Sequence, residues 1–89
     1  MKNDKRNIQR RKILADNIGR LRYQAGYSQQ QFANLIGVCK SIYQRYEWNM
    51  VEPRFTVVCR MAEVLEVDIR QLVLSEKEWK AIEEKTHGS

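Results

Sequence analysis

The fold is decided by the stretch from Ser28 to Glu47, which reads SQQQFANLIGVCKSIYQRYE. It holds two short amphipathic patterns separated by one glycine, Gly37. Ser28 with Gln31 forms a capping box that predicts the start of the first of these helices, and Gly37 predicts its end. The second helix, of about nine residues, follows at once. Two short helices joined by so tight a turn have the spacing of a helix-turn-helix.

The second of these helices has two faces of different chemistry. At about 100° per residue, one face gathers aromatic and aliphatic side chains together with one carboxylate, and we expect it to be buried. That face is formed by Cys39, Ile42, Tyr43, Tyr46 and Glu47. The opposite face carries mainly donors of the kinds that pair with base edges and phosphates. It is formed by Lys40, Ser41, Gln44, Arg45 and Trp48. Any solvated helix face is polar, so polarity alone does not indicate DNA binding. The position of this helix directly after a tight turn is what favours a role in reading DNA.

The remaining segments also follow helical spacing, which predicts an all-α fold. An apolar stripe predicts a first helix from near Ile13 to Gly26, with that glycine in the left-handed conformation. Another stripe predicts a helix over residues 55–65. Capping boxes that begin at Asp68 and Ser75 predict two shorter helices after it.

The composition indicates one small domain that binds a polyanion. The chain has 89 residues, of which 43% are hydrophobic and 30% charged, and its formal net charge is +5. Residues 1–60 hold twelve Lys and Arg against four Asp and Glu, whereas residues 61–89 hold four against seven. A concentrated positive field favours phosphate binding, although a merely solvated surface could carry the same charge. No segment has the pattern of a membrane span or a signal peptide, so we expect a cytoplasmic protein.

Cysteine and histidine usage gives no sign of a metal site or an enzyme. Cys39 and Cys59 lie 20 residues apart without a second ligand pair, so we expect reduced and mostly buried thiols. His87 stands alone in what we expect to be a frayed end. The sequence also lacks a paired acid and base, a nucleophile with an orienting histidine and a phosphate-cradling glycine loop. We therefore expect no catalytic residues, no metal and no cofactor.

Three segments, in this order, resemble the phage-repressor or Cro-like helix-turn-helix domains, also called the XRE family. They are IGRLRYQAGYSQQQFANLIGVCKSIYQRYE, WNMVEPRF and VVCRMAEVLEVDIRQL. The resemblance spans residues 17–72 and implies a compact five-helix domain like that of lambda repressor, to which this chain adds a short sixth helix. Cys39 stands where Ser or Thr usually caps, Tyr43 where Ile or Val usually packs, and Asn49 and Glu66 where Gly usually ends a helix. Cys39 is a weaker cap, whereas Asn49 tolerates the left-handed conformation.

The resemblance also implies which residues contact DNA. Gln29 matches a position that hydrogen-bonds a phosphate and can brace the recognition helix, which is the second helix of the helix-turn-helix. The positions that face the major groove are matched by Lys40, Ser41, Gln44 and Arg45. Those in or beside the loop that touches the DNA backbone are matched by Trp48, Asn49 and Arg54. Arg54, which could also reach the minor groove, stands where Ser or Thr would cap a helix, and such lapses tend to mark functional positions.

A structural ion pair is expected between Arg22 and Glu47. Glu47 lies at the edge of the buried face, an odd place for a free carboxylate. Arg22 lies near the end of the first helix, one residue beyond an apolar position, and the family has a matching pair at these two positions. The pair would tie the first helix to the end of the recognition helix.

Two flanks lie outside the resemblance. Residues 1–12 carry six basic residues and are expected to form a flexible arm that either lies on DNA or only solubilises the chain. The helix-turn-helix domain is expected over residues 13–74, and a C-terminal helix with a frayed end over residues 75–89. This last helix carries Trp79 and Ile82, which either pack back on the domain or form a dimer seam.

Two functions fit these patterns. The first is a sequence-specific transcriptional regulator, a repressor, that binds double-stranded DNA as a homodimer joined by its last two helices. Leu72 is a further apolar candidate for that seam. The second is an antitoxin-type or restriction-controller-type protein of the same fold, which would also bind a protein partner through an exposed apolar patch.

Overall fold

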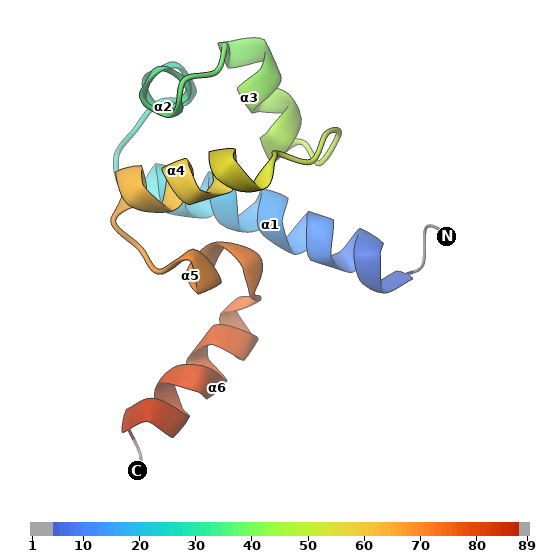
Figure 1. Cartoon of the computed structure of the whole chain (residues 1–89), viewed down its shortest axis with the longest axis vertical. Coiled ribbons are helices and arrows are strands. Elements are labelled where there is room, and N and C mark those ends of the chain that lie inside the picture. Colours follow the sequence, from blue (N-terminus) through green and yellow to red (C-terminus); the bar gives the residue numbers. More distant parts are fainter. Residues whose placement is uncertain (1–4, 88–89) are drawn as a thin grey trace.

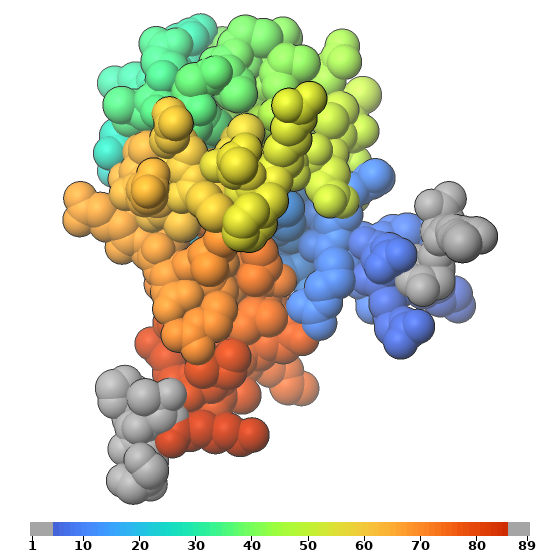
Figure 2. Space-filling view, viewed as in Figure 1, coloured from blue at the N-terminus to red at the C-terminus, as the bar shows by residue number. Residues whose placement is uncertain are grey.

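The computed structural model describes residues 5–87, which contain six helices and no strand (Figure 1). In chain order they are α1 (Lys5–Gln24), α2 (Gln29–Ile36), α3 (Lys40–Glu47), α4 (Phe55–Leu65), α5 (Ile69–Val73) and α6 (Glu76–His87). The prediction of an all-α fold is confirmed. α2 and α3 lie at one end of the molecule and α6 projects at the other (Figure 2). None of the helices within residues 5–87 combines the length and apolar character that a membrane span requires.

Three of the short helices begin where the sequence offers a cap. At Ser28 and Ser75, the side chain accepts a hydrogen bond from the N–H three residues on, whose own side chain accepts from the cap's N–H. At Asp68, the side chain accepts from the N–H of Arg70 at 2.9 Å, and the Gln71 side chain accepts from the N–H of Asp68 at 3.3 Å. Gly26 follows α1 at φ 87° and Gly37 ends α2 at φ 82°. Local chemistry therefore sets these boundaries as predicted.

A single core joins the first five helices. Ile18, Phe32, Tyr43, Met61 and Leu72, one from each of α1 to α5 in order, are fully buried. Burying such a side chain contributes about 1.5 to 3 kcal/mol. Leu72 was expected as a candidate for a dimer seam, and this is wrong, because α5 packs against α1 and α4 with Leu72 on its inner side.

A buried polar side chain, Asn17 of α1, fixes α5 in place. Its Nδ2 donates to the main-chain oxygens of Leu72 at 2.8 Å and Leu74 at 2.7 Å. Its Oδ1 accepts from Nη2 of Arg20 at 2.9 Å. These bonds satisfy carbonyls at the end of α5 that have no partner within that short helix.

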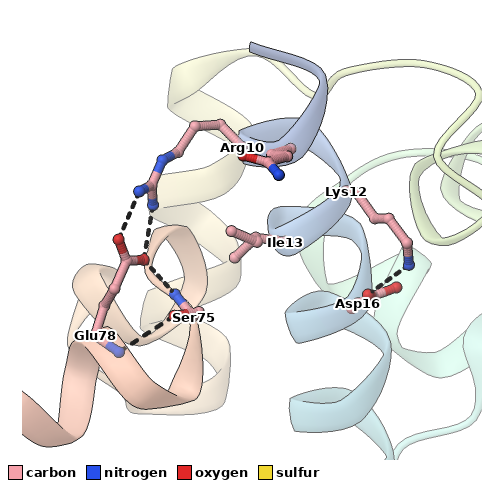
Figure 3. A pocket seen from close by; sticks show the side chains of 7 residues that line it. Arg10, Lys12, Ile13, Asp16, Ser75 and Glu78 are labelled. Atoms are coloured by element: carbon pink, nitrogen blue, oxygen red, sulfur yellow. Dashed lines mark hydrogen bonds and ion pairs between the residues drawn. The ribbon is translucent and has the colours of Figure 1, made fainter. Parts of the chain in front are cut away.

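α1 begins earlier than predicted. We expected a start near Ile13 behind a flexible arm over residues 1–12, but the chain is helical from Lys5 onward, and residues 1–4 lie outside the described part. Long-range contacts account for the difference. Nη1 and Nη2 of Arg10 lie 2.8 and 2.5 Å from the carboxylate oxygens of Glu78, at the first turn of α6 (Figure 3). Such contacts join segments far apart in the chain, so they leave no trace in local sequence pattern.

α6 packs back on the domain in part. The Arg70 guanidinium lies over the Trp79 ring, 5.3 Å from its centroid, and both Trp79 and Ile82 are half-buried. A cation over an indole face stabilises by about 0.5 to 1 kcal/mol at exposed sites. The frayed end was expected at His87 and the two residues after it, but His87 is the last residue of α6, and residues 88–89 lie outside the described part.

The two cysteines are less buried than predicted. Cys39 is exposed and Cys59 is half-buried. Cys39 was assigned to the inner face of the recognition helix, but it is the N-cap residue, whose extended backbone (φ −77°, ψ 158°) departs from the helical rotation that the assignment assumed. The pKa of the Cys39 thiol is lowered, most by its hydrogen bond with Ser41 and less by hydrogen bonds from backbone N–H groups.

Two described non-glycine residues take the left-handed conformation. They are Asn49 at φ 59° and Glu66 at φ 56°, both at positions where the family usually has glycine. The N–H of Glu66 donates to the oxygens of Ala62 and Glu63, which closes α4. A side chain in this conformation costs about 1 to 2 kcal/mol, less for Asn.

Glu66→Gly should therefore stabilise the protein, because glycine removes the strain of the left-handed conformation. Glycine also loses more chain entropy on folding, and the net gain should be about 0.5 to 1 kcal/mol. Glu66→Ala is the matched control, because it removes the same charge and keeps the Cβ. Urea unfolding of both variants measures the difference, and a glycine variant no more stable than the alanine variant would contradict the expected strain.

Candidate nucleic-acid interface

α3 presents a polar face to solvent and is anchored by aromatic side chains from behind. Lys40, Ser41, Arg45 and Trp48 are exposed, the last at 60%. Tyr43 and Tyr46 are buried, with the Tyr43 ring edge-on to Phe32 at 5.4 Å between centroids. The two expected faces of this helix are thus present, apart from Cys39.

An ion pair ties the end of α3 to α1. Nε of Arg22 lies 2.6 Å from Oε2 of Glu47, and only 15% and 11% of the two side chains are exposed. Nη1 of Arg22 also donates to the main-chain oxygen of Tyr27 at 2.7 Å, in the loop before α2. The expected pair is therefore present, and one guanidinium joins α1, the α1–α2 loop and α3.

Glu47 collects several donors besides Arg22. The Tyr43 hydroxyl donates to its Oε2, and Nε2 of Gln29 donates to its Oε1 at 3.1 Å. Burial opposes the charged form, but the hydrogen bonds from Arg22, Tyr43 and Gln29 hold the pKa of the Glu47 carboxyl below its usual value. Burial and the bond to Glu47 raise the pKa of Tyr43. At neutral pH the site therefore holds a carboxylate and a neutral phenol.

Gln29 braces the recognition helix from the start of α2. Its Oε1 accepts from Nε2 of Gln44 at 3.0 Å, while its own Nε2 donates to Glu47. Gln44 is half-buried, so it belongs to the bracing network as well as to the outer face. The chain of contacts runs from Gln44 through Gln29 and Glu47 to Arg22.

The loop after α3 carries the remaining predicted contacts. Arg54 is exposed at the N-cap of α4 and makes no side-chain capping bond. Asn49 is half-buried, and its Oδ1 accepts from Nε of Arg11 at 2.9 Å. Met50 and Phe55, in the same loop and at the start of α4, are exposed at 62% and 73%.

Two contacts of this region were missed from sequence. Tyr43 lies four residues before Glu47 on one helix, so the spacing of neighbouring side chains could have suggested their bond. Arg11 lies 38 residues from Asn49, and no local pattern points to it. In the part of the chain that the structure describes, no group of three or more His, Cys, Asp and Glu side chains could hold a metal ion.

Comparison with known proteins agrees with this geometry. The sequence model of the helix-turn-helix family matches residues 18–72. The chain belongs to the XRE-type helix-turn-helix family. No curated protein matches the chain in sequence.

Two solved structures share the fold of this XRE-type protein. One is the crystal structure of a hypothetical transcription factor, NHTF, from Neisseria, with a TM-score of 0.75 and 26% identity over 84% of this chain and 85% of that one. The other is the solution structure of an SOS-response transcriptional repressor, LexA, from Eubacterium rectale. Its TM-score is 0.73 with 19% identity, over 86% of this chain and 78% of that one, a likeness in fold alone.

Membership of this family identifies the biochemical class. This XRE-type protein is a DNA-binding transcriptional regulator and not an enzyme.

Glu47→Gln should lower the free energy of unfolding at pH 7 by about 3 kcal/mol, because it leaves a largely buried guanidinium without its counter-charge. The pKa of the Glu47 carboxyl is lowered from 4.5 in the folded protein, so the wild type loses the stability that the ionised carboxyl contributes as the pH falls below 4.5. The Glu47→Gln variant has no carboxyl at this position, so it loses no such stability. The gap between the two proteins should therefore narrow at pH 3.

Denaturant unfolding at both pH values measures the gap. Hydrogen bonds from Arg70 and Arg10 hold the pKa values of Asp68 and Glu78 at about 2, and both groups titrate alike in the two proteins. Glu63→Gln, at an exposed position of α4, controls for the loss of one charge. A gap of constant size across the two pH values would contradict the assignment.

Proposed function

We propose that this protein is a sequence-specific regulator that reads the major groove with α3. The observation that supports it most directly is the exposed donor face of α3 above the braced ion pair of Arg22 and Glu47. Base reading needs side chains held in register with the groove, and a helix fixed from behind meets that need. We assign base-edge contacts to Lys40, Ser41, Gln44 and Arg45.

Phosphate contacts are assigned to the residues around that face. Gln29 at the start of α2, with Trp48, Asn49 and Arg54 beside the loop after α3, would set the register of the protein on the duplex. Arg54 could also enter a narrow minor groove, where A·T-rich sequence strengthens the negative potential. We propose repression, acting on DNA in the cytoplasm, because occupancy of a promoter is sufficient for it.

The proposed regulator acts as a homodimer on a two-fold operator. One module of this size contacts too little DNA for tight specific binding, whereas two copies on half-sites about one helical turn apart multiply the contacts. Trp79 and Ile82 of α6 are the seam candidates that stay accessible in part. The antitoxin-type or controller-type alternative would use the same two side chains to bind a protein partner.

Selection of binding sites from random duplexes tests whether the protein binds DNA sequence-specifically. Arg45→Ala tests whether α3 reads the bases. Arg45 can donate as a planar fork to guanine O6 and N7, so its loss should cost about 1 to 3 kcal/mol at one G·C pair and relax selectivity there. Arg54→Ala, which removes the same charge, should instead weaken all duplexes by similar factors and flatten the salt dependence by about one unit of slope. Equal losses on matched and scrambled duplexes for Arg45→Ala would sink the base-reading role of α3.

Sedimentation at micromolar concentration should show a dimer, and two chains on a palindromic duplex. Trp79→Ala should shift the equilibrium toward monomer, because it removes the largest apolar side chain of the proposed seam. Tyr23→Ala, on α1 at 78% exposure, is the matched aromatic control and should leave the dimer intact. Monomer alone, with and without the duplex, would refute the dimer.

A further inference from the structure

The contact between Arg11 and Asn49 joins α1 to the end of the recognition helix and has no role in the function proposed above. Nε of Arg11 donates to Oδ1 of Asn49 at 2.9 Å, and Nη2 lies 3.4 Å from the main-chain oxygen of the same residue. The family match covers residues 18–72, so Arg11 lies outside it. Arg11 is therefore a feature of this chain that the family pattern does not explain.

Asn49 closes the last turn of α3. Its N–H donates to the oxygen of Tyr46 at 3.2 Å, and the next N–H, of Met50, donates to the oxygen of Arg45 at 2.9 Å. Asn49 itself is left-handed at φ 59°. Because Arg11 holds both the main-chain and the side-chain oxygen of Asn49, the orientation of the Asn49 amide is fixed relative to α3.

The side-chain oxygen of Asn49 is bonded to Arg11, so its side-chain nitrogen is the group left to bind a ligand. Within residues 5–87, Nδ2 of Asn49 has no acceptor, and the residue is only half-buried. The NH₂ group can only donate, and in a loop beside a base-reading helix the abundant acceptors are phosphate oxygens. Asn49 thus has the free donor and the fixed orientation that a backbone contact requires.

Arg11 lies on a turn of α1 that also contacts α6. The neighbouring Arg10 is bonded through both terminal nitrogens to Glu78 at the first turn of α6, at 2.8 and 2.5 Å (Figure 3). The same turn of α1 is thereby held against α6 by one arginine and against the recognition loop by the next. Arg11 is itself half-buried rather than extended into solvent.

We propose that Arg11 is a positioning residue for DNA binding, which fixes the Asn49 amide so that Nδ2 donates to a phosphate at the end of the recognition helix. The inference rests on the proposed function and deepens it, since it gives the basic start of α1 a defined role. Arg11 acts through Asn49 and does not itself have to touch DNA.

The test uses the full chain and the duplex obtained by site selection. Arg11→Ala removes the positioning group, and Asn49→Gly removes the donor while glycine keeps the left-handed backbone without strain. Lys12→Ala is the matched control, because Lys12 carries the same charge on the next residue but pairs with Asp16 at 2.9 Å on an exposed side. Thermal unfolding of each variant checks that it is folded.

Each protein is titrated against duplexes in which single phosphates are replaced by neutral methylphosphonates. One replacement should weaken the wild type and Lys12→Ala about threefold to tenfold more than it weakens Arg11→Ala and Asn49→Gly, the effect of one hydrogen bond beyond the general loss of one phosphate charge. On the unmodified duplex, the double variant should bind no more weakly than Asn49→Gly alone.

The outcomes separate this inference from the function on which it rests. If no duplex is selected, both fail. If a duplex is selected but Arg11→Ala keeps the sensitivity of the wild type, or Asn49→Gly keeps it while Arg11→Ala loses it, only the inference is overturned. The last result would mean that Arg11 contacts the phosphate directly.

Discussion

The ion pair of Arg22 and Glu47 is the interaction on which the end of the molecule formed by α2 and α3 depends. α3 has only eight residues, and its N-cap, Cys39, makes no side-chain capping bond. Helices shorter than about 12 to 15 residues are marginal in water, so tertiary contacts must hold this one. Arg22 supplies such a contact at the end of α3 and also bonds the loop before α2. Both helices of the helix-turn-helix are thereby held by the same arginine of α1.

Tyr43 explains how a charged pair is tolerated so close to the core. Its ring is fully buried and packs edge-on against Phe32, while its hydroxyl donates to Glu47. One side chain therefore belongs to the apolar core at one end and to the polar network at the other. Within the described residues, no buried side-chain nitrogen or oxygen lacks a hydrogen-bond partner. A buried network in which every member is satisfied rigidifies its surroundings, as the base-reading role proposed for α3 requires.

Much of the fold could be predicted because its boundaries are written in local chemistry. The caps at Ser28, Asp68 and Ser75 and the left-handed Gly37 each need only a few neighbouring residues, and all are found as expected. The two faces of α3 follow from rotation along one helix in the same way. Cys39 was misplaced because that rotation was extended one residue too far, into the cap.

The start of α1 could not be predicted for a related reason. The partners of Arg10 and Arg11 lie 68 and 38 residues away, so their contacts exist only once the whole domain is folded. A basic, polar segment read by itself has the composition of a disordered arm. The accessibility of Leu72 was likewise undetermined by sequence, because periodicity gives the face of a helix but not what covers it.

These long-range contacts also change the meaning of the charge asymmetry. In the first 60 residues, Arg10, Lys12 and Arg22 are paired with Glu78, Asp16 and Glu47. The two exposed pairs, of Arg10 and Lys12, add little stability, whereas the pair of Arg22 is largely buried. Each of the three cancels a positive charge that a composition count would assign to DNA. Lys40, Arg45 and Arg54 form no ion pair within the described residues, and all three lie on or beside α3. Three of the positive charges that folding leaves without an ion pair thus lie on or beside α3, the surface proposed above to read DNA.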